Sequence, residues 1–460
     1  MKITFRGAAR EVTGSCHLVT VNSSTIALDC GLFQGRRSES HHKNLQLPVP
    51  IDQLQAVVLS HAHIDHSGRL PYLVRSGFAK TIWTTAATRD LCAIMLADSA
   101  HIQRQDAAHL ARHHKTFIEP LYDQKDVKRT ISLMVTVPYG RWFDVAPGIR
   151  AQFVDAGHIL GSAIVVVECA EGERGRTLVY SGDLGRHGQP IIRDPQVPDR
   201  ADHIILESTY GNRAHEPSMD MRSRLGAIVR ATTARGGRLL IPAFAVGRTQ
   251  EIIYDLHALY RAGEIPEIPV YVDSPLAIDA TGVFAMHPEI FDQQEPLVQR
   301  AEDVFDFRLV RYTRDVDESK ALNEHHGPMV IIAASGMAET GRILHHLAHG
   351  ANDPRNTILI VGFQAEHTLG RRIVERQPTL RIYDELVPLR AEVQVLNGYS
   401  AHADKQELES WVQAVSAAAG HKPEVSLVHG EVTAQDALAT RLSVLGYSVG
   451  TPGAGEVVDL

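Results

Sequence analysis

The sequence predicts an α/β protein in which one domain is interrupted by a second domain with a mainly parallel sheet. Three observations support this fold class. Short runs with β-branched residues fill the first part of the chain, strand-then-helix units repeat in the middle, and short strands resume towards the end. The length of 460 residues suits two domains, or one domain that contains a large insertion.

The first part of the chain has the pattern of an antiparallel meander. Runs with β-branched residues lie at Lys2–Phe5, His17–Val21 and Thr25–Leu28, and Gly and Asn-Ser turns separate them. An apolar strand at Ala56–Ser60 and a helix over Arg69–Gly77 follow. Further strands are expected at 151–154, 164–168, 177–180 and 203–206.

The middle of the chain repeats the strand-then-helix unit, which favours a parallel, three-layer α/β domain. The strands of these units are expected at 238–241, 270–272, 330–333 and 357–361. Strands at 392–396 and 424–428 are read as a return to the first domain. The predicted boundaries are therefore 1–208 and 389–460 for the interrupted domain and 209–388 for the insertion.

Composition restricts the class of protein. Hydrophobic residues make up 44% and charged residues 22% of the chain, as in globular proteins. The start does not resemble a secretory signal, and no stretch approaches the roughly 20 apolar residues of a membrane span, so we expect a cytoplasmic protein without a membrane partner. The formal charge of −8 argues against general attraction to nucleic acid. A nucleic-acid site would need local positive charge, which bound divalent cations could supply.

The strongest chemical signal is the segment Ser60–Gly68, which follows an apolar strand and contains His61, His63, Asp65 and His66. Alternate side chains of an extended backbone share a face, so His61 and His63 can meet at one metal ion. The following turn can direct Asp65 and His66 towards a neighbouring ion. Nitrogen and oxygen donors without thiolate favour zinc, with iron and manganese as alternatives. The other reading of this segment is a solvated His-rich loop.

Further polar residues end predicted strands, where the active-site groups of α/β proteins gather. These residues are His158, Asp183, Glu207, His402 and His429. A single histidine at a strand end is more often a surface residue, but several such positions together favour a shared site.

The whole set of motifs resembles the β-CASP branch of the metallo-β-lactamase superfamily, which includes the endonuclease subunit of the cleavage and polyadenylation specificity factor. The resemblance extends from Asp29 in Leu28-Asp29-Cys30-Gly31 to His429 in Val428-His429-Gly430-Glu431. It implies a metallo-β-lactamase αββα sandwich interrupted by an inserted β-CASP α/β domain. Glu207, His402 and His429 resemble the motifs A, B and C of this branch.

The resemblance also implies a centre with two Zn²⁺ ions. In this family one ion is held by the counterparts of His61, His63 and His158. The other is held by the counterparts of Asp65, His66 and His429, and the counterpart of Asp183 bridges the two ions. Asp29 would be a buried structural carboxylate near the site rather than a ligand.

A ribonuclease is the activity that the resemblance implies. It would hydrolyse phosphodiester bonds of single-stranded RNA through a metal-bridging hydroxide, as an endonuclease and with 5′-to-3′ exonuclease activity left open. Asp65, His402 and Glu207 are the expected catalytic residues, with His402 as general acid and Glu207 as its hydrogen-bond partner. Alternatively, His402 and Glu207 only support the zinc ligands. His429 favours RNA over DNA, because DNA-repair members of the family carry an apolar residue there. The resemblance allows a homodimer.

Substrate contacts are expected from glycine-containing turns before helices, whose backbone N–H groups can bind phosphate. The residues expected to contact RNA are Ser335, Gly336, Arg248, Arg371, Ser400 and Ala401, with Arg342 as a further candidate. Ordinary βα turns with surface arginines would give the same pattern.

The sequence leaves two other functions open. A small-molecule metallo-hydrolase of the lactamase or glyoxalase-like type would lack the insertion and the motif with His402. An inactive scaffold in an RNA-processing complex would have lost metal ligands, whereas all of them are present in this sequence.

Overall fold

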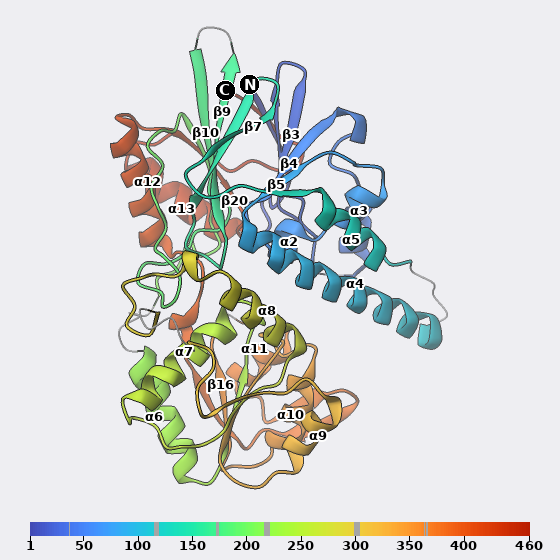
Figure 1. Cartoon of the computed structure of the whole chain (residues 1–460), viewed down its shortest axis with the longest axis vertical. Helices are drawn as coiled ribbons and strands as arrows, with labels where there is room; N and C mark the ends of the chain where they lie inside the picture. The colour runs from blue at the N-terminus through green and yellow to red at the C-terminus, as the bar shows by residue number, and fades with distance from the viewer. Residues whose placement is uncertain are drawn as a thin grey trace. The chain divides into compact units, whose positions relative to one another are not determined.

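The computed structural model describes residues 1–35, 37–114, 119–171, 174–215, 221–298, 304–362, 364 and 367–460. The chain forms two compact units (Figure 1). The first unit consists of Met1–His187, Asp194–Ala214 and His402–Leu460, and the second consists of Gly188–Arg193 and His215–Ala401. The second unit is thus inserted into the first.

One sheet of the first unit has seven strands in the order β22-β1-β2-β3-β4-β5-β6. The strands are β1 (Lys2–Gly7), β2 (Cys16–Val21), β3 (Ser24–Leu28), β4 (Leu54–Val58), β5 (Ile82–Thr84), β6 (Met134–Thr136) and β22 (Val457–Asp459). The pairs β1·β2 and β2·β3 are antiparallel, so the predicted meander is confirmed. From β3 to β6 the pairing is parallel.

The other sheet of this unit also has seven strands, in the order β21-β20-β11-β10-β9-β8-β7. The strands are β7 (Trp142–Ala146), β8 (Ile149–Asp155), β9 (Ala163–Glu171), β10 (Arg174–Tyr180), β11 (His203–Glu207), β20 (Glu424–Val428) and β21 (Val449–Gly450). Strands β7 to β10 are antiparallel neighbours, and β10, β11, β20 and β21 are parallel neighbours. The carboxyl ends of β10, β11 and β20 therefore lie at the same edge of the sheet.

The two sheets pack face to face because their strands bury alternate apolar side chains. Ile3 and Phe5 of β1 share one buried cluster with Phe153 of β8. On the opposite face of the second sheet, Trp411 and Leu438 contribute to a separate cluster. These two residues belong to helices α12 and α13, so the outer face of this sheet is covered by helices.

Helices flank both sheets of the first unit (Figure 1). They are α1 (Arg37–Asn44), α2 (Ile64–Ser67), α3 (Leu70–Arg75), α4 (Ala86–His114), α5 (Gln124–Leu133), α12 (Lys405–Ala419) and α13 (Val432–Val444), with the 3₁₀ helix η1 (Ile51–Gln53). Figure 1 shows α12 and α13 on one side and α2 to α5 on the other, which confirms the αββα sandwich. Of the helices that the structure describes, none is both long enough and apolar enough to span a membrane.

The inserted unit is built on a six-stranded sheet in the order β14-β13-β15-β12-β16-β19, whose pairs are all parallel. The strands are β12 (Arg238–Pro242), β13 (Val270–Val272), β14 (Val310–Tyr312), β15 (Met329–Ala333), β16 (Thr357–Ile360) and β19 (Glu392–Val395). Every residue of β15 and β16 is buried, as expected for a parallel sheet covered on both faces. The predicted mainly parallel α/β insertion is therefore confirmed.

The inserted unit completes its fold with helices and one hairpin. The helices are α6 (Met221–Ala234), α7 (Arg248–Arg261), α8 (Pro275–Met286), α9 (Val316–Glu324), α10 (Arg342–Gly350) and α11 (Leu369–Val374), with the 3₁₀ helices η3 (Pro288–Ile290) and η5 (Asn397–Tyr399). The antiparallel hairpin consists of β17 (Thr379–Ile382) and β18 (Glu385–Pro388). Sequence patterns missed β14 and α9, which form an additional strand-then-helix unit.

The chain returns to the first unit later than the sequence predicts. The sequence places β19 in the returning segment 389–460, but the strand pairs in parallel with β16, from Thr357 opposite Glu392 to Ile360 opposite Val395. The predicted return at residue 389 is therefore wrong for this strand, because an apolar strand pattern does not reveal which sheet the strand joins. The chain re-enters the first unit at His402.

Candidate metal centre

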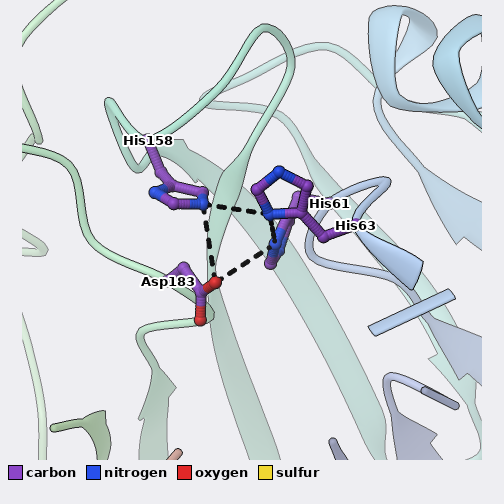
Figure 2. A group of neighbouring side chains, drawn as sticks. All are labelled: His61, His63, His158 and Asp183. Atoms are coloured by element: carbon purple, nitrogen blue, oxygen red, sulfur yellow. Dashed lines mark hydrogen bonds and ion pairs between the residues drawn. The ribbon is translucent and has the colours of Figure 1, made fainter. Parts of the chain in front are cut away.

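Four side chains converge at one point of the first unit (Figure 2). His61 and His63 follow β4, His158 follows β8, and Asp183 follows β10. His63 Nδ1 lies 3.2 Å from His61 Nε2 and 3.2 Å from His158 Nε2. Asp183 Oδ2 lies 3.4 Å from His61 Nε2 and 3.5 Å from His158 Nε2. Tetrahedral zinc with ligand atoms at about 2.0–2.1 Å needs these atoms about 3.3–3.4 Å apart, so the four atoms fit a zinc ion.

A second donor group lies next to the first and consists of Asp65, His66 and His429. His429 Nε2 lies 3.1 Å from His66 Nε2 and 3.4 Å from Asp65 Oδ2. Asp183 joins the two groups, because its Oδ1 atom lies 3.2 Å from His66 Nε2 while its Oδ2 atom faces the first group. Asp183 Oδ1 is buried without a hydrogen bond to any described residue, which fits an oxygen that ligates a cation.

The residue before β2 and the loop after β3 hold the backbone that carries Asp65 and His66. The Ser15 amide donates to the Asp65 carbonyl at 2.8 Å, and the Cys30 amide donates to the His66 carbonyl at 2.8 Å. A Cβ atom at Gly31 would lie 1.5 Å from the Asp65 carbonyl oxygen. Only glycine therefore lets these two segments approach this closely.

A second close backbone approach brings Asp183 beside His158. The Gly185 amide donates to the Ala156 carbonyl at 2.8 Å. A Cβ atom at Gly185 would lie 1.7 Å from the Gly157 carbonyl oxygen, so glycine is required here as well. The loops that carry the two ligand candidates are thus fixed to each other by backbone contacts.

Asp29 orients the histidines from behind, as the resemblance implies for a buried structural carboxylate. It accepts hydrogen bonds from the Ser60 amide, the Ser60 hydroxyl and the Tyr180 hydroxyl, each at 2.7 Å, and its Oδ2 atom lies 2.6 Å from His66 Nδ1. His61 Nδ1 lies 3.0 Å from Ser60 Oγ. These contacts occupy the Nδ1 atoms of both histidines and leave each Nε2 atom for the donor groups.

The electrostatics of the first donor group favour neutral imidazoles beside an ionised carboxylate. Burial, together with the charge of His61, lowers the pKa of His63 to about 3. Burial alone would raise the pKa of Asp183, but the imidazoles of His429 and His66 outweigh this effect and hold its pKa well below the usual range. Neutral imidazole and carboxylate are the forms that bind metal.

His402 and Glu207 form a third group with Asp183. His402 Nδ1 lies 3.1 Å from Glu207 Oε1 and 3.9 Å from Asp183 Oδ2. Glu207 is fully buried at the end of β11, and its carboxylate also accepts hydrogen bonds from the Leu184 and Thr209 amides. Burial alone would lower the pKa of His402, but the charges of Glu207 and Asp183 raise it to about 9. Bound cations would oppose that rise.

The structure brings together the expected metal ligands and the expected catalytic pair. They are His61, His63, Asp65, His66, His158, Asp183, Glu207, His402 and His429, and all belong to the first unit.

Comparisons with known proteins identify the family of the chain. Residues 9–213 match the model of the metallo-beta-lactamase superfamily, residues 249–373 match the Beta-Casp domain, and residues 386–452 match the Zn-dependent metallo-hydrolase RNA specificity domain. Ribonuclease TTHA0252 of Thermus thermophilus is 40% identical over 467 aligned residues, which cover 100% of both chains. The chain belongs to the β-CASP branch of the metallo-β-lactamase superfamily. It is a metal-dependent hydrolase.

Other relatives of this β-CASP protein are longer or more distant. Transcription termination factor FttA of Methanosarcina mazei is 33% identical over 429 residues, which are 90% of this chain and 64% of that protein. FttA of Thermococcus kodakarensis is 34% identical over 451 residues, which are 94% of this chain and 67% of that protein. The chain thus spans about two thirds of these archaeal relatives. A protein of unknown function from Enterococcus faecalis V583 shares the fold, with a TM-score of 0.58 and 13% identity over 100% of this chain and 99% of that chain.

The arginines predicted to contact RNA have partners within the β-CASP unit. Arg248 is 8% exposed, pairs with Glu251, and its guanidinium lies 5.6 Å from the centre of the Tyr399 ring. Arg342 donates to Asp273 Oδ1 at 2.6 Å. Arg248 is therefore a buried ion-pair residue rather than the surface arginine of an ordinary βα turn, and its contact with RNA stays a prediction.

Arg371 keeps a more accessible position than Arg248. It lies in α11, and its side chain is 42% exposed and bonds to Glu375 at 2.7 Å. The carbonyls of Ser400 and Ala401 accept hydrogen bonds from Gln189 at 3.4 and 3.3 Å. RNA contact by these three predicted residues stays a prediction.

The turn with Ser335 and Gly336 differs from the predicted phosphate site at a helix start. Helix α10 begins only at Arg342, after its N-cap residue Gly341. Ser335 Oγ instead accepts hydrogen bonds from the backbone amides of Glu339 and Thr340. A Cβ atom at Gly336 would lie 2.7 Å from the Phe244 ring, so this glycine is required for side-chain packing. The predicted position of this turn at a helix start is wrong.

Sequence reasoning missed the hydroxyl groups that surround the centre. Ser60 directly precedes His61, and its Oγ atom lies 3.0 Å from His61 Nδ1. Thr209 follows Glu207 by two residues, and its Oγ1 atom lies 3.0 Å from His429 Nδ1. A hydroxyl residue beside a ligand position was the available signal. It is weak alone, because serine and threonine also cap and turn the backbone.

Proposed function

We propose that this protein is a zinc-dependent ribonuclease that hydrolyses phosphodiester bonds of single-stranded RNA with two Zn²⁺ ions. One observation carries the proposal. Two donor groups share Asp183, and the pair His402–Glu207 stands next to the same carboxylate. Two adjacent divalent ions with a nearby proton donor suit the displacement of an alkoxide from phosphorus.

The names of related proteins support RNA as the substrate. The full-length relative from Thermus thermophilus is named a ribonuclease, and the archaeal relatives are named transcription termination factors. The domain model that matches residues 386–452 is named for RNA specificity. His402 and His429 both lie within this segment.

In the proposed centre each donor group holds one ion. His61, His63 and His158 would bind the first, Asp65, His66 and His429 the second, and Asp183 both. Zinc ions supply Lewis-acid chemistry there, lowering the pKa of water to about 7 and neutralising charge on the phosphoryl group. Asp65 takes part in catalysis as a carboxylate ligand. The buried hydrogen bonds of Asp29 keep the donor atoms in place without movement during the reaction.

His402 is the proposed general acid. Its Nδ1 atom lies 3.1 Å from Glu207 Oε1, and Nε2 is the nitrogen proposed to give a proton to the leaving oxygen. The His402 side chain is 20% exposed, in contrast to the fully buried Glu207 side chain, so substrate has access to it. A positioned proton donor of this kind contributes about 10²–10⁴-fold to the rate.

The proposal also covers the mode of RNA cleavage, the cellular location and the oligomeric state. We propose endonucleolytic cutting, with 5′-to-3′ exonucleolytic cutting as an additional mode, in the cytoplasm. Denaturing gels of 5′- and 3′-labelled RNA separate the two modes. A homodimer is also predicted, and light scattering of the zinc-loaded protein tests it.

The decisive experiment compares cleavage of end-labelled RNA and matched single-stranded DNA by zinc-loaded wild type, His402→Ala and His421→Ala. His421 is a control, because it lies 3.7 Å from the carboxylate of Asp202 with its side chain 53% exposed. We expect the wild type and His421→Ala to cut RNA, and His402→Ala to lose about 10²–10⁴-fold at unchanged zinc content. Zinc-loaded wild type that cuts neither polymer would contradict the proposed function, and full activity of His402→Ala would contradict the general acid.

A further inference from the structure

Thr209 places its hydroxyl against His429 in a way that none of the predicted roles uses. Thr209 Oγ1 lies 3.0 Å from His429 Nδ1 and 3.0 Å from the His429 carbonyl oxygen. Strands β11 and β20 are parallel neighbours whose last residues, Glu207 and Val428, stand opposite each other. Thr209 and His429 therefore follow adjacent strand ends, and one hydroxyl contacts both the ring and the backbone of the histidine.

The hydrogen-bonding capacity of these groups determines the position of the ring proton. The His429 carbonyl can only accept, so the Thr209 hydroxyl donates its proton to that oxygen. Its lone pair then accepts from His429 Nδ1–H. The proton of a neutral imidazole is thereby placed on Nδ1, and Nε2 keeps the lone pair that a metal ion requires.

The other ring nitrogen faces the second donor group. His429 Nε2 lies 3.1 Å from His66 Nε2 and 3.4 Å from Asp65 Oδ2. The backbone of His429 is separately held, because its amide donates to the Ala8 carbonyl at 2.7 Å and its φ of 52° lies in the left-handed region. His429 Nδ1 also lies 3.5 Å from Asp183 Oδ1, but the Thr209 hydroxyl at 3.0 Å is the nearer acceptor for the Nδ1 proton.

The first donor group contains an equivalent arrangement. His61 Nδ1 lies 3.0 Å from Ser60 Oγ, which donates to Asp29 Oδ2 at 2.7 Å. In both groups, therefore, a hydroxyl oxygen accepts a hydrogen bond from a histidine Nδ1–H. The same hydroxyl donates its own hydrogen bond to an oxygen that can only accept. The acceptor is a buried carboxylate for Ser60 and a backbone carbonyl for Thr209.

We propose that Thr209 is a positioning residue that fixes the tautomer and orientation of His429 and thereby sets the affinity of the second zinc position. This inference rests on the proposed function in that Asp65, His66 and His429 bind an ion. Thr209 acts in this proposal through its hydrogen bonds to His429. Partners of this kind typically change metal affinity by about 10–100-fold when they are removed.

Zinc titration in competition with a chromophoric chelator tests the proposal on the full-length apoprotein. Thr209→Val removes the hydroxyl and keeps a branched side chain. We expect it to bind one zinc ion as the wild type does and the other about 10–100-fold more weakly. Thr209→Ser keeps a hydroxyl, so we expect it to bind the second zinc ion with an affinity within a few-fold of that of the wild type.

Thr130→Val is the matched control for loss of a buried threonine hydroxyl. Thr130 is fully buried in α5 of the same unit, and its Oγ1 donates to the Asp126 carbonyl at 2.8 Å. We expect its two zinc affinities to equal those of the wild type. Circular dichroism of each apoprotein verifies that the variants are folded.

The outcomes separate this inference from the proposed function. Wild-type affinity for both ions in Thr209→Val would overturn the role of Thr209, even if RNA is cleaved. Failure of Thr209→Ser to restore the second affinity would also overturn it, since the hydroxyl would then not be the determinant. Two tightly bound ions in a wild type that cuts no RNA would refute the ribonuclease but leave a positive Thr209 result intact.

Discussion

The two units differ in the partners that surround their buried carboxylates. In the β-CASP unit, the buried carboxylate of Asp273 accepts from Arg342 at 2.6 Å and from Ser319 at 2.6 Å, and lies 2.7 Å from His346 Nε2. In the first unit, Asp183 Oδ1 is buried without a hydrogen bond to any described residue, and it lies 3.2 Å from His66 Nε2 and 3.5 Å from His429 Nδ1. The network around Asp273 is satisfied by protein groups alone, whereas a buried carboxylate oxygen without a hydrogen bond suits a cation ligand.

The largest effect is expected at the shared carboxylate. Asp183→Asn weakens the ligand of both proposed ions, so we expect zinc content to fall and RNA cleavage to decrease on the order of 10³-fold or more, because metal stabilisation is worth several kcal/mol. Elemental analysis and cleavage of labelled RNA measure these two quantities. Retention of both ions with full activity would place the metals elsewhere and would remove the contrast between the units.

The corresponding change in the β-CASP unit should affect stability instead. Asp273→Asn leaves Arg342 and His346 without their buried carboxylate, so the free energy of unfolding should fall by about 3–5 kcal/mol. Denaturant unfolding of the apoprotein measures this change, and zinc affinity should remain that of the wild type. Loss of zinc in this variant would show that Asp273 is more than a structural group.

Acid should reduce the contribution of Asp273. Burial alone would raise its pKa, but hydrogen bonds from His346, Ser319 and Arg342 lower it below the usual value. A depressed folded-state pKa adds stability above the unfolded-state pKa of about 3.9, and this stability is lost as pH falls through the folded-state pKa. The difference in unfolding free energy between wild type and Asp273→Asn should therefore shrink below about pH 4. A difference that instead grows on acidification would contradict this assignment.

The smallest effect is expected from substrate contact in the β-CASP unit. Its predicted arginines have internal partners, but Phe244, in the turn after β12, is 49% exposed between buried neighbours. Aromatic rings of this kind stack on bases, so Phe244→Ala should weaken RNA binding about tenfold, while zinc content stays the same. Fluorescence anisotropy with a labelled oligonucleotide measures the affinity. Unchanged affinity would mean that this ring is not part of the RNA surface.

The same contrast explains which features the sequence could predict. His61, His63 and His66 stand close together in the chain, and the strand ends that carry His158 and His429 are marked by apolar runs, so their meeting could be inferred. The strands of the parallel insertion were also recognisable, because buried strands are nearly continuous apolar runs. Such patterns depend on burial and periodicity, which local sequence records directly.

Other features depend on long-range pairing that local sequence does not record. The partner sheet of β19 is fixed by its contact with β16, and nothing in Glu392–Val395 specifies that choice. Arg248 looks like a surface cation until its ion pair with Glu251 is known. The role of Thr209 depends equally on a residue far away in the chain, His429.

The central claim is that Asp183 joins two zinc positions. A crystal structure of the zinc-loaded protein, with anomalous difference density measured at the zinc edge, tests it most directly. The account predicts two peaks about 3.5–4 Å apart, with one carboxylate oxygen of Asp183 directed at each. A single peak, or density from which Asp183 or His429 points away, would contradict it.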